Sequence, residues 1–300
     1  MAQISDIVSS CWRIAICGTE STLGTALIEH LQLAGCEIVS LSEDDFRLPP
    51  TDYAAKIEGV KAVINLSGEP YVAKWKGRYE FDIYKSRLEA IRSTGVALRY
   101  CKTKPDVFLT ISNAMVYDQF EVHDEYSTEY GDSLMSEVGL METEEAKKIE
   151  ARTPEVRLVV LRLGYLMSVE GGAYPMLATL AKIGWGGRVD DGYQCLPMVH
   201  IEDAIRCIIT LISDDNSRGI FNVTIPEMAS MNELVKAFAE SMSRSQHRLP
   251  KFIIKMLAGR AINLLEQNCK VEPRRLNELG FEFRYPSVES IVKDLQKKDN

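Results

Sequence analysis

The sequence predicts an α/β protein in which helices cover both faces of a doubly wound parallel sheet, with a smaller and mostly helical carboxy-terminal unit. Three features predict this class: short runs that are apolar on both faces, helical segments that alternate with those runs, and glycines that bound several of them. Strands buried on both faces are typical of parallel sheets enclosed between two layers of helices. Regular alternation with helices is what a doubly wound fold requires.

The predicted strands are short apolar runs separated by helical or turn-forming segments. In chain order they are residues 13–17, 37–41, 61–66, 107–112, 157–162 and 220–223. Residues 23–34 have helical spacing and stop at Gly35, and a longer helical region covers about 79–102.

The pattern changes after about Gly164, where a glycine-rich stretch begins. Three helical segments follow, near 202–212, 232–243 and 288–296. We expect a first domain at 12–165 and a smaller domain at 166–300 that holds most of these helices. The strand near 219–225 is expected to rejoin the sheet, so that the two domains interleave along the chain.

The composition excludes several classes of protein. With 46% hydrophobic and 26% charged residues the chain is an ordinary globular one, and no apolar run approaches the roughly 20 residues of a membrane span. A formal net charge of −8 disfavours a nucleic-acid surface, because phosphate binding requires clustered Lys and Arg. Residues 1–11 have neither the basic patch nor the apolar stretch of a secretory signal.

The cysteines and histidines show no pattern typical of disulfide bonds or of a metal centre. Seven cysteines are widely spaced without a C-x-x-C pair, which fits reduced thiols and a cytoplasmic protein. The four histidines have no ligand spacing among themselves or with the cysteines, so no metal is predicted.

A glycine-bounded turn follows the first predicted strand and opens the first helix. It is Gly18-Thr19-Glu20-Ser21-Thr22-Leu23-Gly24, which matches G-x-x-G-x-x-G except that Ser21 replaces the middle glycine. A helix amino terminus attracts a pyrophosphate through its free N–H groups and its dipole. We therefore expect a dinucleotide here, held by Gly18, Thr19, Ser21, Thr22, Leu23 and Gly24. The alternative is that the outer glycines permit only a tight turn and close helix packing.

Three side chains bear on which anion this turn accepts. A Cβ at Ser21 reduces the room for a phosphate, and Glu20 places negative charge beside it. Glu43 lies 19 residues beyond Gly24, near the end of the second strand. An acid at that position hydrogen-bonds an adenosine ribose and repels a 2′-phosphate, which favours NAD over NADP.

Several further segments, in shared order, resemble the NAD-dependent epimerase/dehydratase family, that is, extended short-chain dehydrogenases/reductases. More narrowly, the chain resembles an atypical subgroup called "epimerase family" proteins, over about residues 13–297. The segments are Asn65-Leu66-Ser67-Gly68-Glu69, Trp75, Ser86-Arg87, Leu161-Arg162-Leu163-Gly164, residues 192–203 ending Pro197-Met198-Val199-His200-Ile201-Glu202-Asp203, and the tail at 270–286.

This resemblance implies a Rossmann domain that holds NAD or NADP and a smaller carboxy-terminal domain that binds a small-molecule substrate. It implies oxidoreductase or epimerase chemistry in the crevice between them. The family usually relies on a Tyr-x-x-x-Lys pair. Tyr130, the tyrosine best placed by position, is followed at that spacing by Leu134, and the one tyrosine with a lysine four residues later is Tyr100, with Lys104, at the end of a predicted helix. The subgroup also tends to lack this pair.

Candidate site residues cluster after predicted strands, where ligands bind in open α/β sheets. Ser67, Gly68 and Ser112 are expected to contact the cofactor. The catalytic candidates are Glu69, as an acid or base, and Asn113 with Tyr117 at the next strand. Asn113 stands where the family has its catalytic hydroxyl, but an amide cannot relay a proton as a hydroxyl does. Capping by Glu69 and simple packing of Tyr117 are the alternatives.

Three residues of the second half are expected to line the substrate side. In the glycine-rich segment, Trp185 could stack on a ligand and Arg188 could hold an anionic group. His200 precedes a predicted helix and is expected to line the site, while Asp203 could act on the amino terminus of that helix. An ordinary turn and a structural histidine are the alternatives.

Two hypotheses of different class remain. The first is an NAD(P)-dependent enzyme acting on an unknown small molecule, with its proton relay unassigned. The second is a catalytically inactive Rossmann scaffold that senses a nucleotide or binds a protein. The absence of a Tyr-x-x-x-Lys pair at Tyr130 and the altered turn motivate the second. A homo-oligomer is compatible with both.

Overall fold

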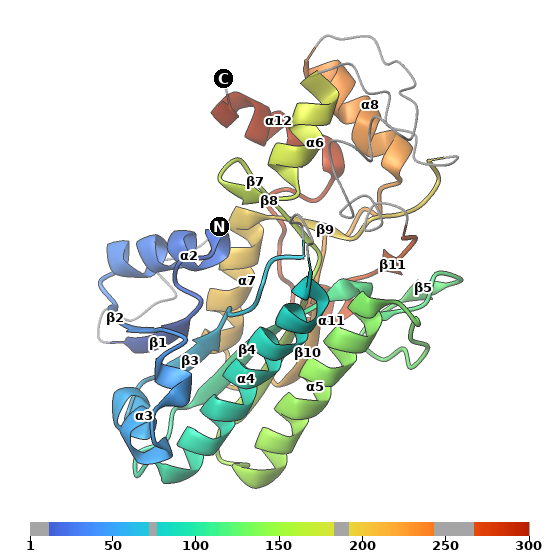
Figure 1. Cartoon of the computed structure of the whole chain (residues 1–300). Helices are drawn as coiled ribbons and strands as arrows, with labels where there is room; N and C mark the ends of the chain where they lie inside the picture. The colour runs from blue at the N-terminus through green and yellow to red at the C-terminus, as the bar shows by residue number, and fades with distance from the viewer. Residues whose placement is uncertain (1–11, 72–76, 183–191, 243–266, 300) are drawn as a thin grey trace.

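A single parallel sheet organises most of the chain. The computed structural model describes residues 12–71, 77–182, 192–242 and 267–299. Six strands pair in the order β10-β6-β4-β3-β1-β2, and every neighbouring pair is parallel (Figure 1). They are β1 (Arg13–Cys17), β2 (Glu37–Leu41), β3 (Ala62–Asn65), β4 (Val107–Asn113), β6 (Arg157–Leu163) and β10 (Gly219–Val223). The predicted doubly wound fold is confirmed.

Helices enclose this sheet from both sides because its strands are apolar on both faces. Ile16 and Leu161 share one core with α2 (Thr22–Leu33) and α7 (Ile201–Ser213). Ala15 and Phe108 share the opposite core with α3 (Pro50–Ile57), α4 (Tyr79–Tyr100) and α5 (Leu134–Arg152). The short helix η1 (Asp45–Arg47) connects β2 to α3. The sheet is thus the middle of three layers.

The helix expected near 202–212 belongs to this sheet core and not to a separate second unit. Ile205, Ile208 and Ile212 of α7 are buried in the same cluster as Leu27 of α2. The strand expected to return near 219–225 does so, because β10 pairs with β6 along its length. The sheet unit therefore continues well beyond residue 165.

A smaller unit packs beyond the carboxyl ends of the strands, with its own apolar core (Figure 1). Its three-stranded sheet runs β8-β7-β9. Its main elements are β7 (Tyr165–Ser168), β8 (Gly171–Gly172), β9 (Met198–His200), α6 (Tyr174–Lys182), α8 (Met231–Ser241) and α12 (Val288–Asp299). Short connecting elements are η2 (Ala114–Val116), β5 (Val122–His123), β11 (Lys270–Val271) and α11 (Arg274–Glu278).

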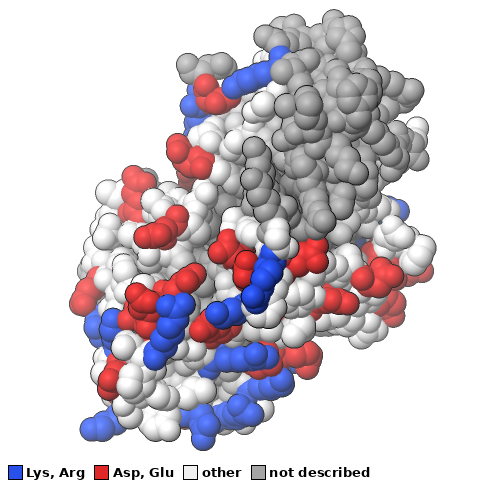
Figure 2. Space-filling view, in the orientation of Figure 1, with Lys and Arg blue, Asp and Glu red and all other residues white. Residues whose placement is uncertain are grey.

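Charged side chains of both signs lie on the surface, and the described helices are of limited apolar length. Acidic and basic side chains are interspersed on the described part of the face in Figure 2, without a continuous basic surface. None of the described helices is long and apolar enough to cross a membrane.

One buried carboxylate ties the carboxy-terminal segment to the sheet unit. Asp203, in the first turn of α7, is fully buried. It accepts hydrogen bonds from the backbone N–H groups of Arg284 at 2.9 Å and Tyr285 at 2.8 Å, and from Arg206 at 2.8 Å. Hydrogen bonds to a charged acceptor are the stronger kind. Asp203 therefore fixes the start of the chain segment that leads into α12.

We predict that Asp203→Ala lowers the free energy of unfolding by about 3 kcal/mol, because two backbone N–H groups and Arg206 lose a charged acceptor. Urea denaturation measures this change. Asp215 offers the control, since its carboxylate is 82% exposed and 3.7 Å from Lys61. Asp215→Asn should cost less than about 0.5 kcal/mol. A loss that small in Asp203→Ala would contradict the assignment of Asp203 as an anchor.

Candidate functional site

The turn between β1 and α2 lies directly against the end of β3. Gly18 has a φ of +74°, and a Cβ at this position would stand 2.6 Å from the carbonyl carbon of Leu66. Neither the backbone conformation nor that contact admits a side chain. The amino terminus of α2 is therefore held over the carboxyl ends of the central strands, with Gly24 buried beneath the turn.

Ser21 closes this turn on itself. As the N-cap of α2, its hydroxyl accepts from the Gly24 N–H at 3.0 Å and donates to the Gly18 carbonyl at 2.7 Å. Among the described residues, the N–H groups of Thr22 and Leu23 in the first helical turn have no hydrogen-bond partner. Such free N–H groups, with the helix dipole, attract an anion.

A cavity of about 660 Å³ opens above these N–H groups. Residues 18–23 of the turn form its floor, and residues 41–43 after β2 and 66–70 after β3 form two walls. In the sheet, β2 lies on one side of β1, and β3 followed by β4 lies on the other side of β1. The cavity thus occupies the switch point where ligands bind in open parallel sheets.

Most of the predicted cofactor contacts come together in this cavity. It is lined by Gly18, Thr19, Ser21, Thr22, Leu23, Glu43, Ser67 and Gly68. Glu20 and Glu69 line it as well. Glu69 is half-buried, and its backbone N–H donates to Ser86 at 3.0 Å. Of the three catalytic candidates, Glu69 alone reaches this cavity.

A smaller hollow of about 160 Å³ adjoins the first and shares Glu43, Ser67 and Glu69 with it. Arg47 and Lys85 also line this hollow. Arg47 pairs with the exposed Asp44 at 2.9 Å. The region beyond Glu43 is therefore of mixed charge.

Ser112 and Asn113 do not reach the cavity, contrary to expectation. Both are buried and bonded into the main chain around α5. Ser112 donates to the Gly139 carbonyl at 3.1 Å. The Asn113 amide donates to the Met135 carbonyl at 3.0 Å, and its oxygen accepts from the Met115 N–H at 3.0 Å. In their place Ile111 lines the cavity from β4.

Tyr117 is likewise turned away and packed inside. Its hydroxyl accepts from Arg162 at 2.6 Å and donates to Asn222 at 3.0 Å, and its ring stacks on His123. Burial raises the pKa of Tyr117 to about 12. The phenol is therefore protonated near neutral pH and fully engaged, so the packing alternative holds for this residue.

His200 is a structural residue and does not line the crevice. It is fully buried at the N-cap of α7, where Nδ1 accepts from the Glu202 N–H at 3.1 Å. Its Nε2 lies 3.2 Å from Asp294 on α12. Burial lowers the pKa of His200 to about 4, so the ring is neutral near pH 7. The expected positions of Trp75, Trp185 and Arg188 lie outside the described residues.

Among the cavity-lining residues that the sequence analysis did not assign, four come from α4, the end of β6 and the smaller unit. Arg87 of α4 is the only cation among the described lining residues. Leu163 ends β6, while Leu166 and Gly172 come from β7 and β8 of the smaller unit. The motif Ser86-Arg87 contributed to the family resemblance but had no assigned role. Both units thus contribute walls to the same cavity.

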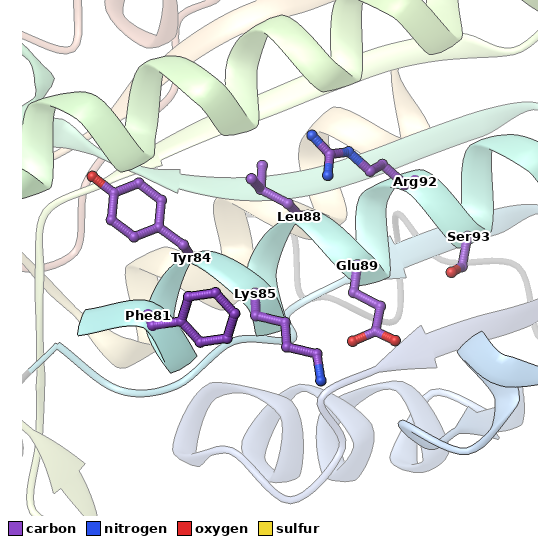
Figure 3. Close-up of a pocket in the computed structure, with 7 residues that line it drawn as sticks. All are labelled: Phe81, Tyr84, Lys85, Leu88, Glu89, Arg92 and Ser93. Carbon is purple, nitrogen blue, oxygen red and sulfur yellow. The ribbon is translucent and has the colours of Figure 1, made fainter. Parts of the chain in front are cut away.

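A separate hollow of about 410 Å³ lies on the outer surface of α4 (Figure 3). Its lining includes Phe81, Leu88 and Arg92, and none of these residues lines the crevice. The described residues bring no group of three metal-ligating side chains together.

The comparisons with known proteins agree with this architecture. The family described as "Domain of unknown function (DUF1731)" matches residues 249–295. An epimerase family protein of Staphylococcus saprophyticus is 26% identical over 93% of this chain and 98% of its own length. A chloroplastic epimerase family protein of Arabidopsis thaliana, an SDR39U1 homolog, is 26% identical over 80% of this chain and 70% of its own.

Two solved structures extend the similarity to three dimensions. Human epimerase family protein SDR39U1, solved with NADPH, superposes with a TM-score of 0.82 at 25% identity, over 95% of this chain and 99% of that one. A UDP-glucuronic acid 4-epimerase from Bacillus cereus, solved with UDP-glucuronic acid and NAD, has a TM-score of 0.75 at 14% identity. It covers 96% of this chain and 100% of its own. At 14% identity this similarity concerns the fold alone.

A pair of titrating side chains joins α2 to α7. His30 lies 3.4 Å from Glu202. Hydrogen bonding to Glu202 raises the pKa of His30 above 6.5, and the same bond lowers the pKa of Glu202 to about 2. The raised histidine pKa stabilises the fold below pH 6.5, and this contribution is lost as pH rises. The lowered carboxylate pKa stabilises it above pH 4.5, and this contribution is lost toward pH 2.

We predict that His30→Gln lowers the free energy of unfolding by about 1 kcal/mol at pH 6 and by less at pH 9, because the stabilisation that comes from the raised pKa of His30 is lost as pH rises. Urea denaturation at both pH values measures the difference. Lys236→Gln, which breaks an exposed pair with Glu240, should have little effect at either pH. An equal loss at pH 6 and pH 9 would show that the ion pair is not the cause.

Proposed function

Because the chain is an epimerase-family protein of the short-chain dehydrogenase/reductase type with a small carboxy-terminal domain, we propose that its cavity binds a nicotinamide dinucleotide. One observation carries this proposal. The cavity of about 660 Å³ lies directly over the free N–H groups of Thr22 and Leu23. Its size falls within the roughly 300–1,000 Å³ typical of cofactor sites.

We place each part of the dinucleotide against the walls of the cavity. The pyrophosphate lies on the first turn of α2, with Gly18, Thr19 and Ser21 around it. The adenosine ribose meets Glu43 after β2. The nicotinamide half then extends over β3 and β4 toward Ile111, where the lining is apolar. When bound, the nicotinamide supplies hydride transfer.

We infer a preference for NAD over NADP. Glu20, Glu43 and Glu69 line the cavity, and Arg87 is the only described cation that faces them. A carboxylate at Glu43 accepts hydrogen bonds from the ribose hydroxyls and repels a 2′-phosphate. Arg47 and Lys85 are the cations that line the adjoining hollow, and Arg47 is already paired with Asp44.

A small molecule is the proposed substrate, bound where the two units meet above the nicotinamide end. Leu166 and Gly172 of the smaller unit line the cavity at that end. Glu69 is the proposed acid or base, because it is the catalytic candidate that lines the cavity. The six cysteines in the described residues are free, which suits a reducing compartment such as the cytoplasm.

A second function, dinucleotide binding without turnover, is favoured by the state of the β4 end. Three side chains at this end form hydrogen bonds to other protein groups inside the fold: Ser112, Asn113 and Tyr117. The chain also lacks a Tyr-x-x-x-Lys pair at Tyr130, and Tyr100 with Lys104, which have that spacing, do not line the cavity. A nucleotide sensor or protein-binding scaffold needs the cofactor cavity but no proton relay. Detection of hydride transfer to a carbonyl or sugar-nucleotide substrate would remove this second function.

Calorimetric titration of the purified protein with NADH and NADPH tests the proposal. We predict measurable binding of both and tighter binding of NADH. No heat and no thermal shift with either dinucleotide at millimolar concentration would reject the proposal.

We predict further that Glu43→Gln weakens NADH binding about tenfold, which corresponds to roughly 1.4 kcal/mol for hydrogen bonds to a charged group. The same variant should bind NADPH more tightly, since a repulsive charge is removed. Glu37→Gln is the matched control, because Glu37 is exposed, begins the strand that Glu43 follows and pairs with Arg13 outside the cavity. Unchanged NADH and NADPH affinities in Glu43→Gln would contradict the role of Glu43.

A further inference from the structure

An ion pair between α4 and α5 is buried behind one wall of the cavity. The Arg87 side chain is 5% exposed and that of Glu142 is 2% exposed, with Nη1 and Oε1 3.1 Å apart. The second guanidinium nitrogen of Arg87, Nη2, donates to the backbone carbonyl of Glu69 at 2.9 Å. One guanidinium therefore joins α5 to the chain segment that forms the cavity wall.

The packing around Arg87 holds the whole of that wall. Gly68 has a φ of +142°, and a Cβ there would stand 2.5 Å from the Arg87 Cγ and 2.9 Å from its Cζ. On the other side, the ring of Tyr71 lies 3.9 Å from the guanidinium carbon. The Tyr71 hydroxyl in turn accepts from the Asn113 amide at 3.2 Å. Arg87 is thus enclosed between the backbone at Gly68 and the Tyr71 ring.

Stability alone does not account for this pair. A buried ion pair usually stabilises a fold no more than an apolar pair of similar volume, because both charges lose their hydration. Here one further atom of each partner, Nε of Arg87 and Oε2 of Glu142, is buried without a hydrogen bond. Burial also raises the pKa of Glu142. Retention of so costly a pair points to a task other than joining two helices.

The same two helices carry a second ion pair that serves as a comparison. Arg92 and Glu145 lie 2.8 Å apart, and the Arg92 side chain is 54% exposed. Figure 3 shows Arg92 on the outer part of α4, among the residues of the surface hollow. This pair bridges α4 and α5 without contact with the cofactor cavity.

Charge gives Arg87 a second role. The described cavity lining contains the carboxylates of Glu20, Glu43 and Glu69 and no cation except Arg87. A dinucleotide brings two further negative charges into this space. Arg87 is placed to offset them, and its position depends on Glu142.

We propose that Arg87 is the positioning residue of the dinucleotide site: it holds the Gly68–Glu69 wall in place and supplies the positive charge that the anionic ligand requires. Glu142 orients Arg87 and does not touch the ligand. This inference rests on the proposed dinucleotide binding. It adds a residue on α4 to the contacts of the turn and of the strand ends.

The test separates positioning from stability with paired substitutions. Arg87→Met alone leaves the buried Glu142 carboxylate without its ion-pair partner and should lower the melting temperature strongly. Combining it with Glu142→Leu replaces the pair by apolar side chains and should restore most of that loss. NADH affinity, measured by calorimetry, should remain at least tenfold weaker in the double variant. The matched control, Arg92→Met with Glu145→Leu, should bind NADH within twofold of wild type.

Wild-type affinity in a stable Arg87→Met/Glu142→Leu protein would overturn the inference, and so would an equal loss in the Arg92 control. If the double variant does not fold, Arg87→Lys decides, since lysine keeps the charge but cannot reach both Glu142 and the Glu69 carbonyl as a fork. About tenfold weaker binding in folded Arg87→Lys supports positioning, and unchanged binding overturns it. Failure of the wild-type protein to bind either dinucleotide removes the proposed function itself.

Discussion

The close approach of Gly18 to the main chain of Leu66 is the constraint on which the site depends. Because no side chain separates them, the turn after β1 lies against the end of β3. The first turn of α2 then faces the space between the β2 and β3 walls, with two N–H groups free. Ser21 strengthens this arrangement, since its hydroxyl bonds back into the turn and leaves the cavity open.

What the sequence predicted well was encoded locally. Each strand of the main sheet is a short apolar run, and the glycine turn with its following helix is contiguous, so spacing alone located the floor and two walls of the cavity. The side of the fold on which a helix packs is not a local property. The apolar stripe of α7 suits either core, and only tertiary packing places it beside α2.

The residues that the sequence misplaced are those whose partners lie far along the chain. Ser112 and Asn113 face α5, where the carbonyl groups that they contact lie 27 and 22 residues further along the chain, respectively. The sequence pattern of His200 suggested a site residue, but in the structure Asp294 and Tyr285 pack against its ring. Arg87 was missed for the same reason, because Glu142 lies 55 residues further on. Residue type predicts chemistry, but burial decides whether that chemistry faces a ligand.

The central claim is that the turn at residues 18–24 receives a pyrophosphate despite Ser21 and Glu20. A crystal structure grown with NADH tests it most directly. We expect phosphate oxygens within hydrogen-bonding distance of the Thr22 and Leu23 N–H groups, with a ribose at Glu43. A dinucleotide bound elsewhere on the protein, or an empty turn at saturating NADH, would contradict the account.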